Sequence, residues 1–224
     1  MSKSNTFEND VLRLIFNAVA IANIGDNTVT APLTNLFVAL HTADPGEAGD
    51  QSTFEANYTG YARVAVARSA GGWTVTGNAV SPVANIGFPA CTAGANTVTH
   101  FSIGVASAGA TKILYRGALG SGLGPFTATV ADTLTLPGLT GLAVNDRIAF
   151  AAVNASALPA GITEGVLYWV LTLSGDSITV SSTQAGPTLD ITASGDGVAF
   201  RATPLAISSG VTPSLTTAMT ITED

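Results

Sequence analysis

Short runs of alternating β-branched and aromatic residues, separated by glycine, proline and asparagine, recur along almost the whole chain. A period of two is typical of half-buried strands, and the breaks between the runs are typical of tight turns. Many short strands at regular spacing predict an all-β sandwich or barrel. The predicted strands are 36–41, 61–68, 73–76, 85–88, 97–103, 112–116, 126–130, 133–136, 147–153, 166–173, 177–181, 190–192 and 198–202, and the tail from Pro204 is again strand and turn.

One segment near the N-terminus departs from this period. Apolar residues between positions 7 and 19 recur mostly at helical spacing, and Asn5 followed by Glu8 is typical of a helix N-terminus. The sequence therefore predicts a helix from about Thr6 to about Asn23. We expect its apolar face to pack on the β-structure or on a partner subunit, through Val11, Leu12, Ile15 and Val19.

The charge content excludes several classes of protein. Only 10% of the 224 residues are charged and 46% are hydrophobic, which argues against a disordered chain. No apolar run approaches the roughly 20 residues of a membrane helix, and residues 1–10 lack the pattern of a secretory signal. The net charge is −7 and the eight basic residues form no cluster, so a nucleic-acid partner is not expected. The single cysteine, Cys91, excludes an internal disulfide framework.

Two histidines are the first candidates for chemistry. His41 ends an apolar strand just ahead of Asp44, and His100 lies within another strand close to Ser102. Together these residue types could form a hydrolytic triad, but the G-x-S-x-G pattern of a nucleophile elbow is missing. We therefore predict strand histidines that bond to the backbone or face a partner chain. The sequence predicts no catalytic residue, no cofactor site and no metal site.

An acidic loop and a glycine-rich stretch are weaker candidates. The carboxylates between residues 44 and 55 lack the alternating spacing of a calcium loop, so a solvated acidic loop is favoured and ion binding stays open. The stretch 120–124 lacks the lysine and the following helix of a phosphate loop, which favours a flexible linker. Cys91 is predicted to be a small buried residue. Tyr58, Tyr61 and Trp73 could form a sugar-stacking platform, although core positions are favoured.

Several strings in series resemble a family of tailed-bacteriophage virion proteins. Its characterised relatives include jelly-roll cement, or capsid decoration, proteins. The strings are LFVALHTADPGEAG at 36–49, YTGYARVAVAR at 58–68, GWTVTG at 72–77 and THFSIG at 99–104. The resemblance covers residues 1 to about 121 and resumes at PLAISSGVTP, residues 204–213. It implies a jelly-roll-like β-sandwich with an N-terminal helix.

The segment between these two regions departs from the family pattern. We expect residues 122–203 to form an inserted small β-domain, and residues 1–121 with 204–224 to form the jelly-roll core. The insert carries 2 basic and 6 acidic residues, so it is acidic for its size. Such a surface suits a projection into solvent better than a face docked on a shell.

The resemblance implies a structural virion protein. The expected function is that of a capsid cement protein, which binds the outside of the phage head and clamps neighbouring copies of the major capsid protein. We expect self-association as a homodimer or homotrimer, assembly in the bacterial host cytoplasm, and neither nucleic-acid nor membrane partners. One alternative is a tail or tail-fibre component. Another is a carbohydrate-binding surface module, in which the insert binds a host-surface glycan around Tyr168 and Trp169.

Overall fold

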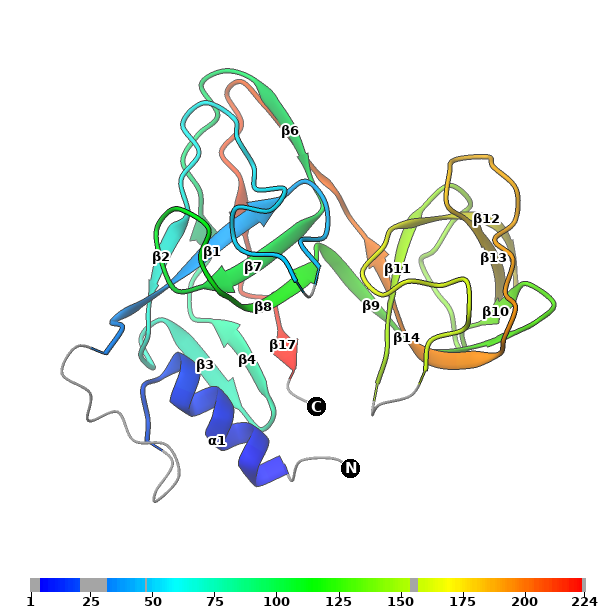
Figure 1. The fold of residues 1–224 in the computed structure, drawn as a ribbon, viewed down its shortest axis with the longest axis horizontal. Helices are drawn as coiled ribbons and strands as arrows, with labels where there is room; N and C mark the ends of the chain where they lie inside the picture. The colour runs from blue at the N-terminus through cyan, green and yellow to red at the C-terminus, as the bar shows by residue number, and fades with distance from the viewer. Residues whose placement is uncertain (1–4, 21–31, 47, 154–156, 223–224) are drawn as a thin grey trace. The chain divides into compact units, whose positions relative to one another are not determined.

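The computed structural model describes residues 5–20, 32–46, 48–153 and 157–222. The chain divides into two compact units (Figure 1). Unit 1 contains Met1–Arg116 and Leu205–Asp224, and unit 2 contains Gly117–Pro204. The sequence placed the junctions after residues 121 and 203. The all-β prediction is confirmed, since the described residues form strands in several sheets and one short N-terminal helix.

Helix α1 spans Asn5–Phe16, so the prediction that it continues to Asn23 is wrong. Ala18 has a φ of 55°, in the left-handed region, and the Val19 amide turns back to donate to the carbonyl of Arg13 at 3.1 Å. The Arg68 guanidinium donates to the carbonyls of Leu14 and Ile15, which have no partner further along the helix. A cation at this end also interacts favourably with the helix dipole. Residues 21–23 lie outside the described residues.

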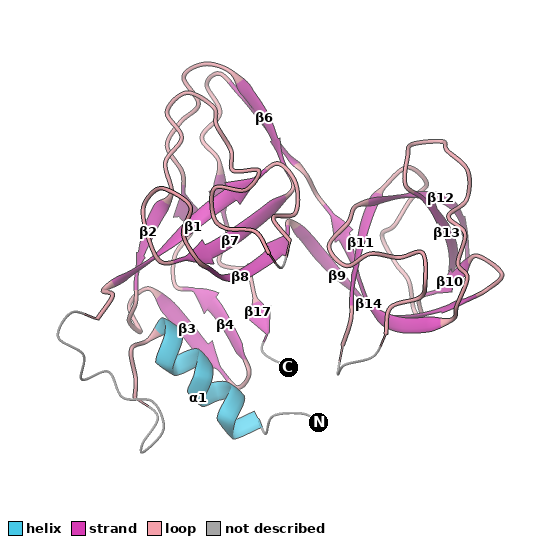
Figure 2. Ribbon diagram, viewed as in Figure 1, coloured by secondary structure: helices cyan, strands magenta, loops and turns pink. Residues whose placement is uncertain are grey.

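The helix packs on a three-stranded sheet with the order β17-β4-β3, shown in Figure 2. Its strands are β3 (Trp73–Thr76), β4 (Ala79–Pro82) and β17 (Ile221–Thr222). Leu12 and Phe16 are fully buried, and the Phe16 ring meets Trp73 edge to face with centroids 4.9 Å apart. Val11 and Ile15 are half-buried. Val19 was expected to pack but is 48% exposed, because it follows the end of the helix.

A four-stranded sheet with the order β2-β1-β7-β8 provides much of the remaining core of unit 1. Its strands are β1 (Asn35–His41), β2 (Val64–Ala67), β7 (His100–Gly104) and β8 (Ile113–Ala118). Strands β1 and β7 are antiparallel, and every residue of β7 is buried. The predicted strand 97–103 is two strands, β6 (Ala95–Val98) and β7, and Thr99 separates them.

The C-terminal tail completes unit 1 by pairing with strands from the first half of the chain. Strand β15 (Leu205–Ser208) pairs with β6, and β16 (Ser214–Leu215) pairs with β5 (Ile86–Gly87). Strand β17 pairs with β4 in the same way. Unit 1 is therefore built from both ends of the sequence, in keeping with a β-sandwich.

Unit 2 is a closed six-stranded barrel with the order β10-β13-β12-β11-β14-β9. Strands β11, β12 and β13 follow one another, and β14 returns beside β11, which is a Greek-key arrangement. The interior is filled mainly by aromatic and branched side chains, among them Phe126, Leu134, Ile148, Phe150, Tyr168, Val170, Ile178 and Val180. The strands are β9 (Gly120–Thr129), β10 (Thr133–Thr135), β11 (Arg147–Ala151), β12 (Tyr168–Ser174), β13 (Ser177–Ser181) and β14 (Gly195–Ala202).

Two local predictions for unit 2 are wrong. The glycine-rich stretch expected to be a linker forms the first half of β9, which pairs with β14 from Gly120 opposite Ala202 onward. A Cβ atom at Gly120 would lie 1.9 Å from the carbonyl oxygen of Arg201, so close backbone approach explains the glycine. Residues 190–192 were expected to be a strand but form a loop, in which the amide of buried Ile191 donates to Asp132 Oδ1 at 2.7 Å.

Candidate functional site

The structure brings His41 and Ser102 together across strands β1 and β7. The Nε2 atom of His41 lies 2.7 Å from the Oγ atom of Ser102, and its Nδ1 atom lies 2.8 Å from the carbonyl oxygen of Thr53. A peptide carbonyl, and not a carboxylate, therefore orients the imidazole. Both side chains have zero exposed surface, so the Ser102 hydroxyl does not face solvent.

The hydrogen bonds define one consistent protonation state for this pair. A carbonyl can only accept, so Nδ1 of His41 carries the proton and Nε2 accepts from the Ser102 hydroxyl. Burial lowers the pKa of His41 below its ordinary value of 6.5, which outweighs the opposing effect of the bond to Thr53. The imidazole is therefore held neutral inside unit 1.

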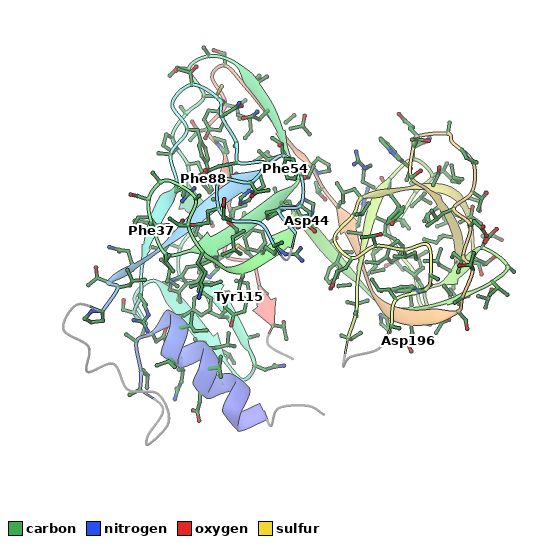
Figure 3. All side chains as sticks on the ribbon, viewed as in Figure 1. Phe37, Asp44, Phe54, Phe88, Tyr115 and Asp196 are labelled. Carbon is green, nitrogen blue, oxygen red and sulfur yellow. The ribbon has the colours of Figure 1, made fainter. Side chains whose placement is uncertain are left out.

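Asp44, the third member of the candidate triad, is engaged elsewhere. Its two carboxylate oxygens lie 2.6 and 2.8 Å from Nη1 of Arg116, and Figure 3 labels its position. His100 is the register partner of His41 on β7 and is only 2% exposed, with Nδ1 2.9 Å from the hydroxyl of Thr99. The arrangement at His41 thus resembles a catalytic pair in distance alone.

A buried arginine, which the sequence analysis did not single out, lies near this pair. Arg63 is 7% exposed, and its Nε and Nη2 atoms donate to the two carboxylate oxygens of Glu55 at 2.6 and 2.8 Å. The remaining donors reach the carbonyls of Ala106 and Gly109 at 3.1 and 2.8 Å. The bonds to Glu55 raise the pKa of Arg63 further, so its guanidinium stays charged.

Gln51 links the histidine and arginine parts of what we call the polar core cluster (His41, Gln51, Glu55, Arg63 and Ser102). The Gln51 amide donates to the carbonyl of Phe37 at 2.9 Å, and its oxygen accepts from Nη1 of Arg63 at 3.3 Å. A Cβ atom at Gly104 would lie 2.1 Å from the Gln51 side chain, so a glycine is needed opposite it. The cluster ties the loop between residues 42 and 55 to the four-stranded sheet.

The three carboxylates of the acidic loop that the structure describes, those of Asp44, Asp50 and Glu55, accept hydrogen bonds from donors of the protein itself. Arg116 binds Asp44 and Arg63 binds Glu55, while Ser52 and Thr53 donate to Asp50. The bonds from Ser52 lower the pKa of Asp50. Glu47 lies outside the described residues. Within the described ranges no group of three or more His, Cys, Asp or Glu side chains could hold a metal ion.

The first candidate sugar platform does not exist as a surface. Trp73 is fully buried under Phe16, and Tyr58 is 3% exposed. The Tyr61 ring stacks on Phe88 with centroids 6.3 Å apart, and its hydroxyl donates to Glu55 at 3.0 Å. Cys91 is buried as well. Trp73, Tyr58 and Cys91 are therefore core residues, as the sequence favours, and Tyr61 is half-buried beside them.

The second aromatic pair, in unit 2, is divided between two environments. Tyr168 lies inside the barrel at 3% exposure, and its hydroxyl accepts from the amide of Thr163 at 2.9 Å. Trp169 is half-buried, and the guanidinium carbon of Arg147 lies 4.5 Å from its ring centroid. The sequence analysis missed Arg147, because its proximity to Trp169 depends on the register between β11 and β12.

Comparison with known protein families places the chain beside phage fibre proteins. A family model described as "Podophage GP4 fiber I protein gp80" matches residues 2–137, which is more than half of the 224 residues. The match continues past Gly117 into unit 2 and includes β9 and β10. Among curated proteins nothing matches. In the described part of the chain no helix is long and apolar enough to cross a membrane.

Proposed function

We propose that this chain, which belongs to the podophage GP4 fiber I protein gp80 family, is a structural component of a phage tail fibre. Membership in this family makes the chain a bacteriophage structural protein and a virion component. The single observation that carries the tail-fibre proposal is the word "fiber" in the description of the family, which matches residues 2–137.

The buried contacts support a structural role that involves no catalysis. The polar core cluster satisfies its charges and hydrogen bonds internally, which fixes loops and strands of unit 1 in one arrangement. The His41–Ser102 pair is buried and so presents no nucleophile at the surface. We therefore propose that the protein acts through its surfaces, as a self-associating assembly protein, and not as an enzyme.

Labelled virions test the location. The Gly175-Asp176 turn between β12 and β13 is exposed, so a short affinity tag inserted there should leave the barrel intact. Gold particles bound to the tag should appear on the tail in electron micrographs of phage, and untagged phage provides the control. Labels distributed over the whole head would overturn the tail-fibre proposal.

Capsid decoration is the second candidate function. The strings at 36–49, 58–68, 72–77 and 99–104 favour it, because the virion-protein family that they resemble includes cement proteins among its characterised relatives. A protein of that kind would bind the outside of the head at a fixed ratio to the major capsid protein. It would also raise the temperature at which heads rupture, because a ligand of the intact lattice stabilises it by mass action. Purified protein added to heads that lack it tests this directly, and absence of binding would exclude the decoration role.

A further inference from the structure

Arg147 and Trp169 form a pair on the outer face of the barrel. They are register partners on the neighbouring strands β11 and β12. The residues that follow Arg147 and precede Trp169, Ile148 and Tyr168, are buried in the barrel core at 0% and 3% exposure. Because successive side chains of a strand point to opposite faces, Arg147 and Trp169 point outward. Both are half-buried there.

The guanidinium of Arg147 has no acceptor among the described residues. Its Nε atom is buried without a hydrogen-bond partner among these residues, and the guanidinium carbon lies 4.5 Å from the centroid of the Trp169 ring. Burial alone lowers its pKa, with no carboxylate opposing the effect.

The other partly buried arginines of the described ranges differ in this respect. Each has an oxygen acceptor: Arg63 binds Glu55, Arg116 binds Asp44, Arg201 binds Asp146, and Arg68 binds the end of α1.

A partly buried cation without an acceptor needs an explanation, because desolvation is unfavourable when no hydrogen bond compensates for it. Stacking on Trp169 supplies some compensation and holds the plane of the guanidinium fixed. A planar fork that is already oriented loses little entropy when an acceptor arrives, which favours binding of an external oxyanion.

We propose that Arg147 and Trp169 form a binding site for a carboxylate-bearing sugar of a surface saccharide. The two Nη atoms of Arg147, which are not buried as Nε is, would bind the two oxygens of the carboxylate side by side. The exposed part of the Trp169 indole would pack against the apolar C–H face of a sugar ring, since indole combines a large apolar surface with a polar edge.

The charge of unit 2 narrows the class of ligand. The unit contains 2 basic and 6 acidic residues, so its surroundings repel densely charged polyanions such as nucleic acids. In a saccharide with isolated carboxylates, each carboxylate brings a single negative charge, which one arginine can balance. The site is independent of whether the protein sits on the tail or on the head, so its test does not depend on the tail-fibre proposal.

The test uses the full-length protein and calorimetric titration with three probes. The acidic probe is a tetrasaccharide of alternating glucuronate and N-acetylglucosamine, the neutral probe is the tetrasaccharide of N-acetylglucosamine, and the third probe is inorganic phosphate. We expect the acidic saccharide to bind at least about tenfold more tightly than the other two, since the charged hydrogen bonds and the stacking act together only there.

Three variants separate the two parts of the site. Arg147→Gln should weaken binding of the acidic saccharide at least about tenfold, and Trp169→Ala should also weaken it. The matched control is Arg201→Gln, because Arg201 lies on the same barrel but is paired with Asp146; binding should stay within about twofold of the original. Circular dichroism checks that each variant remains folded.

Four results would overturn the proposal. One is equal affinity for the acidic and neutral saccharides, and another is equal affinity for phosphate. The third is binding that survives Arg147→Gln in a folded protein. Lack of binding at millimolar concentrations of all three probes would overturn it as well.

Discussion

Ser102 Oγ lies 2.7 Å from His41 Nε2, and neither side chain has any exposed surface. In a hydrolase this distance would suggest an activated nucleophile. Here the imidazole takes its orientation from the Thr53 carbonyl and is held neutral by burial, so the pair cross-links β1, β7 and the loop before Glu55. A hydrogen bond between histidine and serine can thus connect buried strands as well as activate a nucleophile.

The neutral state of His41 predicts loss of stability in mild acid. Its pKa is lowered in the folded protein, so below pH 6.5, the ordinary value, the unfolded chain binds a proton that the folded chain does not. Stability should be complete above about pH 6.5 and should decrease below it, by up to about 1.4 kcal/mol per pH unit until the folded pKa is reached. Urea unfolding between pH 8 and 5, followed by Trp73 fluorescence in a Trp169→Phe background, measures this.

The control for that prediction is His41→Asn, which retains a donor for the Thr53 carbonyl but does not titrate. Its stability should vary less between pH 6.5 and 5 than that of the unsubstituted protein. Parallel pH profiles for the two proteins would show that His41 does not titrate as described.

Arg63→Met should destabilise unit 1 strongly. The substitution leaves the Glu55 carboxylate, whose side chain is 19% exposed, without the guanidinium that binds both its oxygens. Breaking a buried ion pair from one side lowers the free energy of unfolding by about 3–5 kcal/mol. Arg201→Met, at a pair whose arginine side chain is 41% exposed, should lower it by no more than about 1 kcal/mol. Similar urea midpoints for the two variants would contradict the expected difference in their free energies of unfolding.

The buried face of α1 gives a further comparison. Leu12→Ala should lower the free energy of unfolding by about 2–5 kcal/mol, because Leu12 is fully buried against the three-stranded sheet. Val19→Ala should change it by less than about 0.5 kcal/mol, because Val19 is 48% exposed. An equal loss in thermal unfolding for both variants would mean that Val19 is covered, for example by a partner subunit.

Unit 2 should be removable. The Thr203 amide donates to the Leu119 carbonyl at 2.7 Å, so a two-residue Asn-Gly turn can replace residues 120–202 and close a hairpin at this point. The shortened chain should give a β-type circular dichroism spectrum and a cooperative thermal transition. An unfolded product would show that unit 1 depends on the barrel for its stability.

Strands with strict alternation and clear turn residues at both ends could be predicted from the sequence. Trp73–Thr76 and Ser177–Ser181 lie at the predicted residues, and Gly175-Asp176 joins β12 to β13 in a tight turn. Local patterns suffice there because the hydrogen-bond partner is the next segment of the chain.

Features that depend on distant contacts could not be predicted. The glycines of β9 resemble a linker until β14 approaches their backbone, and α1 ends early where Arg68 meets its last carbonyls. His41 and Ser102 are 61 residues apart in sequence, so their contact requires the register of β1 and β7. For the same reason Arg147 gave no signal in the sequence, since only the barrel places it over Trp169.

The hydrogen bond between Leu119 and Thr203 also affects how the gene can gain or lose the segment that encodes the barrel. Because the two ends of the barrel meet as partners in one ladder, a gene fragment encoding residues 120–202 can enter or leave the coding sequence in a single recombination event. Neither flanking strand has to move when it does. A change of length inside the barrel therefore leaves the points at which the chain enters and leaves it side by side.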